Sequence, residues 1–337
     1  MFEAVKAIRV DINWHPGLSI YASEAFLKTV SSEYGWVGGT EDSGNLLCVL
    51  PYSQIRKPVF SLIRFPTQTI PMNGELDVEM EKEFLNKAMD YFRNAGADVV
   101  IPPTVNTVFR TYPDGAMAAP YGSHIIDLTQ GEEKLWSKVH SKHRNVIRNA
   151  TKKGVIIKSG PEYIETAYNL TKESFSRSAN GFIGKMRLEA RMDYESFRRQ
   201  VLGFGEYVKV FVAEYEGTAQ GCVVIPFSQH CAYYMHGGSI SNPLTGTMNF
   251  LQWETIRMFA ERGVKYYDFC GARIDPEKGS KAEGIIKFKE RFGGDLKKGY
   301  TWKYSLRPVK YYLYAQAARV RSGGDVVDQE GHKMKNA

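Results

Sequence analysis

The sequence predicts an α/β protein with mixed parallel and antiparallel sheets, built as two similar lobes in tandem. The first observation is an internal repeat, since residues 49–54 read VLPYSQ and residues 224–229 read VIPFSQ, 175 positions further on. A second pair of similar segments, 91–100 and 258–267, recurs in the same order with an offset of 167 positions. The difference between the two offsets is the size of a loop, so the pairs together favour a duplication.

The second observation is that each half repeats one order of elements. The first half reads as a helix at 23–33, strands at 46–52 and 56–65, a long amphipathic helix at 78–94 and a strand at 98–101. The second half reads as helices at 162–178 and 188–202, strands at 208–215, 220–227 and 231–236, a helix at 248–262 and a strand at 266–269. Gly96 and Gly263 follow the long helices, where a left-handed residue ends a helix. A strand, a helix and an adjacent strand require a crossover, so each sheet should be partly parallel.

Proline occurs in the repeated strand of each half, at Pro51 and Pro226. Because proline cannot donate to a sheet ladder, each one predicts a bulge or a splayed strand end, where a ligand can add its own hydrogen bonds. We expect a first lobe at 1–150, a second lobe at 151–306, and a C-terminal helix at 307–320 that returns to the first lobe. Residues 321–337 are polar and rich in glycine, which predicts a flexible tail.

Composition excludes several classes of protein. The chain has 337 residues, of which 43% are hydrophobic and 24% charged, and this balance rules out a disordered chain, a collagen-like fibre and a membrane bundle. The N-terminal residues lack the basic start and apolar stretch of a secretion signal. Four cysteines without paired ligand spacing predict neither a disulfide scaffold nor a structural metal site. We therefore expect a cytoplasmic protein, monomeric and free of bound metal.

The positive charge of the chain is local. The net charge is +7, yet residues 134–158 contain eight basic side chains and no acidic one, so the rest of the chain carries −1. Apolar residues recur there at helical spacing, which predicts an amphipathic helix with a basic stripe. A solvated helix face is one interpretation. A stripe of one sign also suggests a polyanion such as a nucleic-acid backbone, a phosphorylated substrate or anionic lipid. The candidate contacts are Lys138, Lys142, Arg144, Arg148 and Lys152.

The order of elements resembles an acyltransferase lobe of the GNAT type, and two such lobes make a twin arrangement. In GNAT enzymes that use acyl-CoA, the helix after the splayed strand begins with a glycine-rich loop, Arg/Gln-x-x-Gly-x-Gly/Ala, whose N–H groups hold the pyrophosphate. Residues 242–249 read NPLTGTMN at that position, with a single glycine and no basic residue. This departure argues against an ordinary acetyltransferase.

Three segments resemble the FemABX peptidyltransferases. Residues 141–155 (SKHRNVIRNATKKGV) resemble a basic helix ending in Lys-x-Gly-Val, residues 267–271 (YDFCG) resemble Tyr-Asp-Phe/Leu-Gly-Gly, and residues 286–294 (IKFKERFGG) resemble Phe-Lys-x-x-Phe-Gly. Members of that family transfer an amino acid from aminoacyl-tRNA to an amine of the peptidoglycan precursor's stem peptide. The resemblance, closest to the compact FemX-like ligases, implies aminoacyl-tRNA as donor substrate, no cofactor, a nucleotide-linked (UDP) or lipid-linked precursor as acceptor, and peripheral contact with a membrane.

The same resemblance implies two catalytic candidates. Lys289 stands at the family lysine that meets the acyl-tRNA end and the developing negative charge, and a surface lysine is the alternative interpretation. The reaction needs a neutral amine, and Asp268, at the end of a buried strand, is the best-placed base to accept its proton. A turn aspartate before Gly271 is the other interpretation of Asp268, and the ribose hydroxyl of the tRNA can itself relay the proton. Cys270 replaces the usual glycine.

Substrate contacts follow from weaker matches. Lys28, in AFLK, resembles the lysine of a Trp-x-Lys motif that grips the diphosphate of the nucleotide-sugar, and Arg191 resembles a second diphosphate-binding residue. His236 stands where relatives place a substrate-contacting tyrosine. Tyr234 and His236 follow Tyr233 on one strand, so one of its faces should line a cleft and the other the core. A core histidine is the other interpretation of His236, and surface cations are the other interpretation of Lys28 and Arg191.

Three functions are therefore open. The first is a FemX-like aminoacyl-tRNA-dependent aminoacyltransferase. The second is an N-acyltransferase that uses acyl-CoA or another thioester on the same twin-lobe fold. The third is a non-catalytic protein that binds RNA or a membrane surface through the basic helix.

Overall fold

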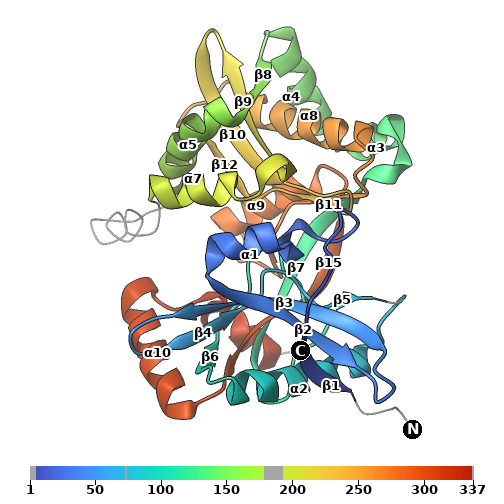
Figure 1. The fold of residues 1–337 in the computed structure, drawn as a ribbon. Helices are drawn as coiled ribbons and strands as arrows, with labels where there is room; N and C mark the ends of the chain where they lie inside the picture. The colour runs from blue at the N-terminus through green and yellow to red at the C-terminus, as the bar shows by residue number, and fades with distance from the viewer. Residues whose placement is uncertain (1–4, 73, 178–192, 336–337) are drawn as a thin grey trace.

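The computed structural model describes residues 5–72, 74–177 and 193–335, and it consists of two lobes with two long strands running between them (Figure 1). The described strands form an 11-stranded sheet and a four-stranded sheet, and the larger one contains both parallel and antiparallel pairs. The predicted fold class, mixed α/β with two tandem lobes, is confirmed.

The first lobe is the lower one in Figure 1, and its elements follow the predicted order. They are β1 (Lys6–Val10), α1 (Glu24–Val30), β2 (Glu33–Thr40), β3 (Leu46–Arg56), β4 (Ser61–Arg64), β5 (Ile70–Pro71), α2 (Val78–Asn94) and β6 (Val99–Val100). Strands β1 to β4 pair antiparallel in sequence order, and β6 pairs parallel with β4. Helix α2 makes the crossover between them. It has the predicted bounds because Asp77 caps its first turn and Gly96, at φ +82°, follows its last one.

The second lobe repeats this order with an additional antiparallel sheet. Its elements are α3 (Glu132–Lys138), α4 (Ser141–Lys152), β8 (Ile156–Ser159), α5 (Ile164–Ser176), α7 (Tyr194–Leu202), β9 (Val208–Tyr215), β10 (Thr218–Pro226), β11 (Cys231–Tyr233), β12 (His236–Ser239), α8 (Thr247–Glu261), β13 (Tyr266–Asp268), β14 (Ala272–Arg273) and α9 (Lys281–Glu290). Strands β8, β9, β10 and β12 form the four-stranded sheet, whereas β11 pairs parallel with β13 in the other. The segment predicted as one strand at 231–236 is thus divided between two sheets.

The two prolines lie where strands part. Pro51 pairs with Trp36 of β2 on one edge of β3. On the opposite edge of β3, Cys48 and Val49 pair with β5, and pairing with β4 begins at Ser53. Pro51 therefore lies between two ladders, where its missing N–H costs nothing. Pro226 is the last residue of β10, next to the point where β11 and β12 separate.

Two long strands connect the lobes. They are β7 (Met117–Asp127) and β15 (Asp295–Ser305), which are antiparallel neighbours from one end to the other. Strand β7 also pairs with β13, and the last residues of β15, Tyr304 and Ser305, pair with β6 of the first lobe. The predicted lobe boundary at residue 150 stays a prediction, but β7 precedes it and pairs with strands of the second half. Tyr311 and Tyr314 of helix α10 (Pro308–Ser322) pack against a small apolar cluster of the first lobe.

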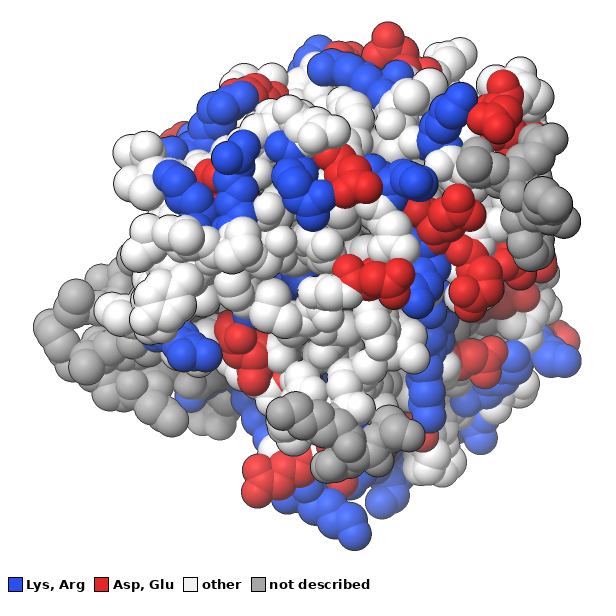
Figure 2. Space-filling model, turned by 90° about the horizontal axis from the view of Figure 1, so that it is seen from below, with Lys and Arg blue, Asp and Glu red and all other residues white. Residues whose placement is uncertain are grey.

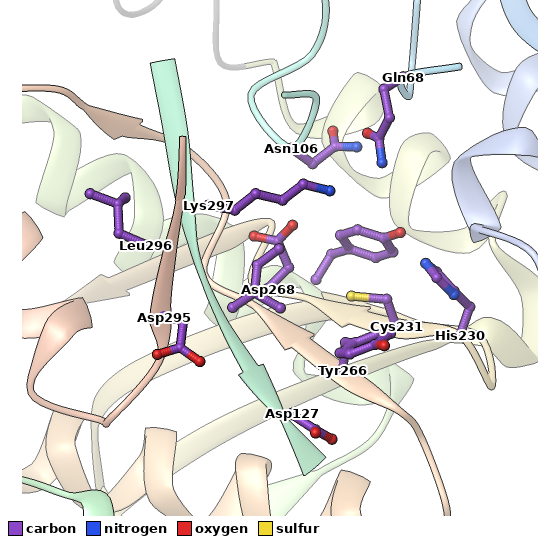
Figure 3. A pocket seen from close by; sticks show the side chains of 12 residues that line it. Gln68, Asn106, Asp127, His230, Cys231, Tyr266, Asp268, Asp295, Leu296 and Lys297 are labelled. Atoms are coloured by element: carbon purple, nitrogen blue, oxygen red, sulfur yellow. The ribbon is translucent and has the colours of Figure 1, made fainter. Parts of the chain in front are cut away.

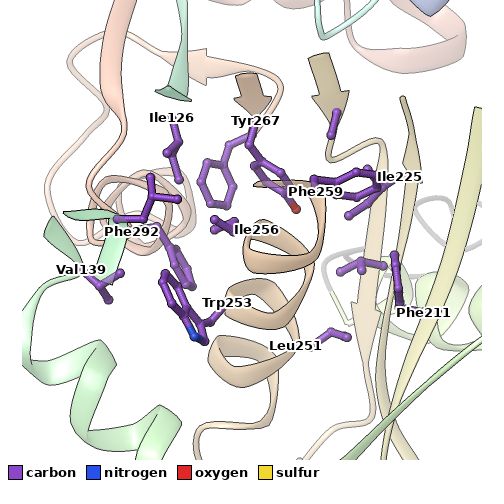
Figure 4. Packing of buried hydrophobic residues seen from close by; sticks show 14 of the residues in the cluster. Ile126, Val139, Phe211, Ile225, Leu251, Trp253, Ile256, Phe259, Tyr267 and Phe292 are labelled. Carbon is purple, nitrogen blue, oxygen red and sulfur yellow. The ribbon is translucent and has the colours of Figure 1, made fainter. Parts of the chain in front are cut away.

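The largest apolar core surrounds α8 (Figure 4). Side chains from α8 meet others from β7, β9, β10, β13 and the end of α9, and the labelled ones include Leu251, Ile256, Phe259, Tyr267 and Phe292. A second core in the first lobe lies under α2. Burial of Tyr267 and Phe292 matters for function because it fixes the end of β13 and the end of α9 against each other.

The basic segment is not one helix. It divides at Val139 and His140 into α3 and α4, because Val139 has extended backbone and the His140 side chain caps α4 by accepting a hydrogen bond from the Lys142 N–H. The prediction of a single helix from 134 onward is therefore corrected to two helices with a turn between them.

The prediction of a flexible tail is wrong for the described residues up to 335. They form α11 (Val326–Glu330) and the short helix η5 (Gly331–Lys335). The buried Nζ of Lys303 donates to Asp325 at 2.9 Å and to Asp328 at 2.6 Å, and Arg273 pairs with Glu330 at 2.9 Å. These ion pairs hold a segment whose composition alone favours disorder.

Candidate active site

Lys289 is buried at the end of β13, with only 7% of its surface exposed. Its Nζ donates to the carbonyl oxygens of Cys270 at 2.5 Å and Gly271 at 2.7 Å. Its position is fixed by neighbours on α9, since Phe288 and Phe292 pack into the α8 core and His143 of α4 contacts the Phe288 carbonyl at 3.2 Å. An ammonium group has three N–H donors, so one remains for a ligand. Burial lowers the pKa of Lys289, and the nearby Asp268 carboxylate opposes that shift.

The backbone that Lys289 contacts is a left-handed turn. Cys270 has φ +50° and Gly271 has φ +69°, and this pair of conformations aims both carbonyls at the lysine. A left-handed residue other than glycine costs roughly 1–2 kcal/mol. The glycine found at this position in the FemABX motif would avoid that cost. A Cβ on Gly271 would lie 2.5 Å from the Tyr121 hydroxyl, so glycine is required there.

A cavity of about 520 Å³ opens beside Lys289. Its walls are mainly apolar and come from α9, β7, β15, the end of α5 and a first-lobe loop at 103–105; the residues that matter below are Tyr121, Val105 and Cys270. Val326 of the docked C-terminal segment closes one side. Arg273 also lines the cavity, but its guanidinium pairs with Glu330. The Lys289 ammonium in a mainly apolar wall is suited to a developing negative charge, because the low local dielectric strengthens the interaction.

Asp268 is 5% exposed and hydrogen-bonded on one oxygen only. Its Oδ1 accepts from the Ser123 hydroxyl of β7 and from the Cys270 N–H at 2.7 Å, while Oδ2 has no hydrogen-bond partner among the residues that the structure describes. Burial raises the pKa of the Asp268 carboxyl, and the hydrogen bonds from Ser123 and Cys270 act in the opposite direction. A carboxylate with a raised pKa and a free oxygen can accept a proton near neutral pH.

Asp268 faces a second cavity of about 500 Å³ between the lobes (Figure 3). The Lys297 side chain extends across this cavity toward Asp268, and Gln68 and Asn106 face it from the first lobe (Figure 3). Two further carboxylates, Asp127 and Asp295, line the same space. Three carboxylates against one lysine make the cavity acidic, which favours a ligand that carries an amine.

The two cavities are neighbours on one face of the β7–β15 pair. Residues at alternate positions of a strand share a face, and Tyr121 lines the Lys289 cavity whereas Ile125 lines the Asp268 cavity. Ser123 lies between them and binds Asp268. A first-lobe loop crosses at the same point, where the Tyr121 hydroxyl donates to the Val105 carbonyl at 3.2 Å. The structure thus brings Lys289 and Asp268 to opposite sides of Cys270, each open to its own cavity.

Of the remaining predicted substrate contacts, Lys28, Tyr234 and His236 line neither cavity. Lys28 is exposed on α1 and pairs with Glu24 at 3.2 Å. Tyr234 packs its ring against Phe269, and its N–H donates to the Asp268 carbonyl. Arg191 lies outside the described residues.

His236 packs its ring against Phe197 of α7, with centroids 5.1 Å apart. Burial lowers the pKa of His236 to about 4, so the imidazole is neutral at pH 7. Its Nε2 is buried and has no hydrogen-bond partner among the described residues. These features describe a core histidine, and it is Tyr233, three residues before it, that lines the Asp268 cavity.

The five basic candidates divide into two groups. The Arg144 guanidinium donates to the Ser137 carbonyl at 2.9 Å, which caps the end of α3, and Arg148 lies over the Trp136 ring at 5.5 Å. These two arginines hold α3 against α4. Lys138, Lys142 and Lys152 are exposed, and no ion pair joins them to an acidic side chain among the described residues. The basic stripe therefore offers three lysines to an external anion.

Sequence reasoning did not single out Ser123, Gln68 or Asn106. Ser123 and Asp268 are 145 positions apart in the sequence and come together through the pairing of β7 with β13. No local sequence pattern predicts that contact. Lys297 belongs to a basic cluster visible in the sequence, but its direction depends on the β15 register. Among the described residues, no three His, Cys, Asp or Glu side chains gather so as to hold a metal ion. None of the described helices combines the length and apolar content needed to cross a bilayer.

Comparison with known proteins agrees with this fold. Residues 137–279 match the family described as the acetyltransferase (GNAT) domain. Among solved structures, the chain is similar to FemX with a TM-score of 0.62 at 15% identity, over 90% of this chain and 94% of that one. It is also similar to the C-terminal domain (DUF2156) of a putative lysylphosphatidylglycerol synthetase from Agrobacterium fabrum, with a TM-score of 0.51 at 14% identity over 91% and 96% of the two chains. No curated protein matches the chain by sequence.

At such identities these structures show the fold alone. The family match assigns a GNAT-type acyltransferase domain to residues 137–279, and the solved structures show a two-lobe fold of the FemX kind. The resemblance to FemX extends over nearly the whole chain and therefore includes both lobes.

Proposed function

We propose that this protein is an aminoacyl-tRNA-dependent aminoacyltransferase that forms an amide bond on an amine of a peptidoglycan-precursor stem peptide or a similar peptide-like acceptor. The observation that carries the proposal is Lys289, a buried ammonium with one unused N–H beside a cavity. The FemX-like fold, the Phe-Lys-x-x-Phe-Gly motif around Lys289 and the acidic neighbouring cavity support it.

The reaction joins a neutral amine to an ester. The amine nitrogen attacks the ester carbonyl carbon, and the carbonyl oxygen takes the negative charge, for which Lys289 supplies a donor. The C–O bond to the ribose then breaks, and the ribose oxygen leaves as a hydroxyl. The proton lost by the amine passes to that leaving oxygen, either directly or by way of Asp268. Because Lys289 binds the Cys270 carbonyl and Asp268 accepts from the Cys270 N–H, the amine and the ester would have to meet beside Cys270, one reactant entering from each cavity.

The acidic cavity fits the acceptor. An ammonium group with a pKa near 10.4 is neutral in only about one molecule in 2,500 at pH 7, a deficit of roughly 4.6 kcal/mol. The free Oδ2 of Asp268 can hold such an ammonium and then remove its proton as the site excludes water. The aminoacyl ester would then bind in the apolar cavity at Lys289, which lies on the other side of the loop at 103–106 from the acidic cavity.

The start of α8 argues against acyl-CoA. Gly246, at φ +93°, packs against α4 so closely that a Cβ there would lie 2.2 Å from the Val146 carbonyl oxygen. In acyl-CoA enzymes of this fold the same position holds the pyrophosphate in an open glycine loop. A carbonyl oxygen at that place repels a phosphate, so the alternative of an acyl-CoA-dependent N-acyltransferase receives less support.

One experiment tests the function. The purified protein is given charged tRNA and a stem-peptide precursor, with and without ribonuclease, and a panel of acyl-CoA thioesters is run in parallel. We expect a gain of one aminoacyl mass on the precursor that ribonuclease abolishes. Transfer from acyl-CoA that persists after ribonuclease treatment would establish the alternative donor instead.

A further prediction concerns the three exposed lysines of the basic stripe. Replacing Lys138, Lys142 and Lys152 with glutamine should weaken tRNA binding and reduce the slope of log K against log salt by roughly 2, since each phosphate contact adds about 0.7–0.9. Arg144 and Arg148 are kept because they hold α3 in place. Filter binding over a salt series measures the slope. The same change at Lys6 and Lys87 of the first lobe is the control. An equal loss of tRNA binding there would mean that the basic stripe is not the tRNA contact.

A further inference from the structure

The outward face of α10 carries several exposed apolar side chains. Val309 is 76% exposed, Tyr312 63% and Val320 78%, and Leu313 is also exposed. At 100° per residue these positions fall on one side of the helix. The opposite side, with Tyr311 and Tyr314, packs against the first lobe. Gln316 falls on the same side between Leu313 and Val320, so the apolar cluster proper is Val309, Tyr312 and Leu313. Isolated exposed apolar residues are common, but a cluster on adjacent turns of one helix is typical of an interaction surface.

The charges around the apolar cluster have one sign. Residues 308–322 include Lys310, Arg319 and Arg321 and no acidic residue. Lys310 and Arg319 lie on opposite edges of the apolar cluster by helical geometry. Carboxylates do lie near α10, but Asp98 pairs with Arg307, and Asp325 and Asp328 bind the buried Lys303.

The turn between β3 and β4 extends the surface. Lys310 Nζ donates to the Val59 carbonyl at 2.6 Å and so ties this turn to α10. Val59 is itself exposed, and Lys57 lies two residues before it. Viewed from below, the side of the molecule on which α10 lies shows mostly uncharged and basic surface, and acidic residues are more numerous on the other side (Figure 2).

We propose that α10 and the turn at 57–59 form a docking surface for an anionic lipid bilayer, with α10 lying along the headgroup region. Apolar side chains flanked by cations are the pattern of a helix that rests in the plane of a membrane interface, where lysine and arginine reach the phosphates. A second copy of the chain fits less well, because a symmetric contact would bring Lys310 and Arg319 against the same residues of its partner. The enzyme would thus be held beside substrates that reside at the membrane surface.

Vesicle flotation tests the proposal without reference to catalysis. The full chain is mixed with vesicles of phosphatidylcholine alone or with about 30% phosphatidylglycerol. We expect it to float with the anionic vesicles only, and to be released as salt rises from about 50 to 500 mM. Protein that stays unbound with anionic vesicles at low salt would overturn the proposal, as would equal binding to both compositions.

Surface variants locate the contact. Changing Val309 and Leu313 together to serine is expected to lower the vesicle partition by at least about tenfold. The reason is that each wild-type side chain exposes apolar area to water in the free protein, and lipid would cover this area in the bound state. Changing Lys57 and Arg319 to glutamine should lower it by about fivefold for each charge. Ile156→Ser, an equally exposed apolar residue on β8, is the control and should bind as wild type. A dimer that the Val309 and Leu313 changes dissociate, with vesicle binding unchanged, would assign the apolar cluster to self-association instead.

Discussion

Replacing Lys289 with methionine is expected to lower kcat for amide formation by about 10²–10³, equivalent to roughly 3–4 kcal/mol of transition-state stabilisation. The ammonium meets negative charge only after the amine has attacked, so KM should change far less than kcat. Methionine keeps most of the buried volume, although the Cys270 and Gly271 carbonyls lose their donor at a cost of about 1–3 kcal/mol. Steady-state kinetics with charged tRNA gives both constants, and circular dichroism shows that the variant is folded.

Lys287→Met is the matched control. Lys287 lies on the same helix but is exposed, and it forms an ion pair with Glu283 at 2.7 Å. Because a surface ion pair contributes at most about 1 kcal/mol, this variant should keep wild-type turnover. If Lys289→Met turned over like Lys287→Met, the oxyanion would have to be stabilised by other groups, such as backbone N–H donors near Cys270.

Asp268→Asn is expected to reduce kcat by about 10²–10⁴ while leaving the protein as stable as wild type, or more so, at neutral pH. Burial raises the pKa of the Asp268 carboxyl, so the folded protein binds this proton more readily than the unfolded chain does. The ionised carboxylate therefore destabilises the fold as pH rises through that pKa. Asparagine carries no charge and can still accept from Ser123 and the Cys270 N–H.

The pH dependence separates the two effects of Asp268. Wild-type kcat should fall as pH drops through the raised pKa of Asp268, and its melting temperature should rise relative to the Asn variant over the same interval. Asp295→Asn, in the same cavity but exposed, should change neither profile. An Asp268→Asn enzyme with wild-type rate and pH profile would transfer the base role to the ribose hydroxyl of the tRNA.

The elements best predicted from sequence are those whose stability is local. Helix α2 and strand β9 have the predicted bounds because their patterns of burial and their flanking caps or turns all lie within a few residues. Lys289 and Asp268 could be chosen because each occurs in a recognisable motif. The parallel pairs β4–β6 and β11–β13 follow from the crossovers between them.

The features that the sequence could not predict depend on contacts between residues that are far apart in the sequence. Strand β7 carries Pro120 and Gly122, residues that weaken strand prediction, and it is stabilised by β13 and β15 from the other half of the chain. The docked C-terminal segment resembles a disordered tail until Lys303 supplies the partner of Asp325 and Asp328. His236 packs against Phe197 and lines neither of the two cavities, so its role as a substrate contact stays a prediction.

The course of β15 has a consequence for how the enzyme can move. One continuous strand is hydrogen-bonded to β7 along most of its length and to β6 at its end, so swinging one lobe away from the other would tear a sheet apart. Access for bulky reactants must then come from rearranged loops, such as the one at 103–106, rather than from a hinge. For the same reason neither half is a transferable module. A gene fragment that ends before Asp295 would leave unpaired strand edges on both parts of the larger sheet, and such edges promote aggregation.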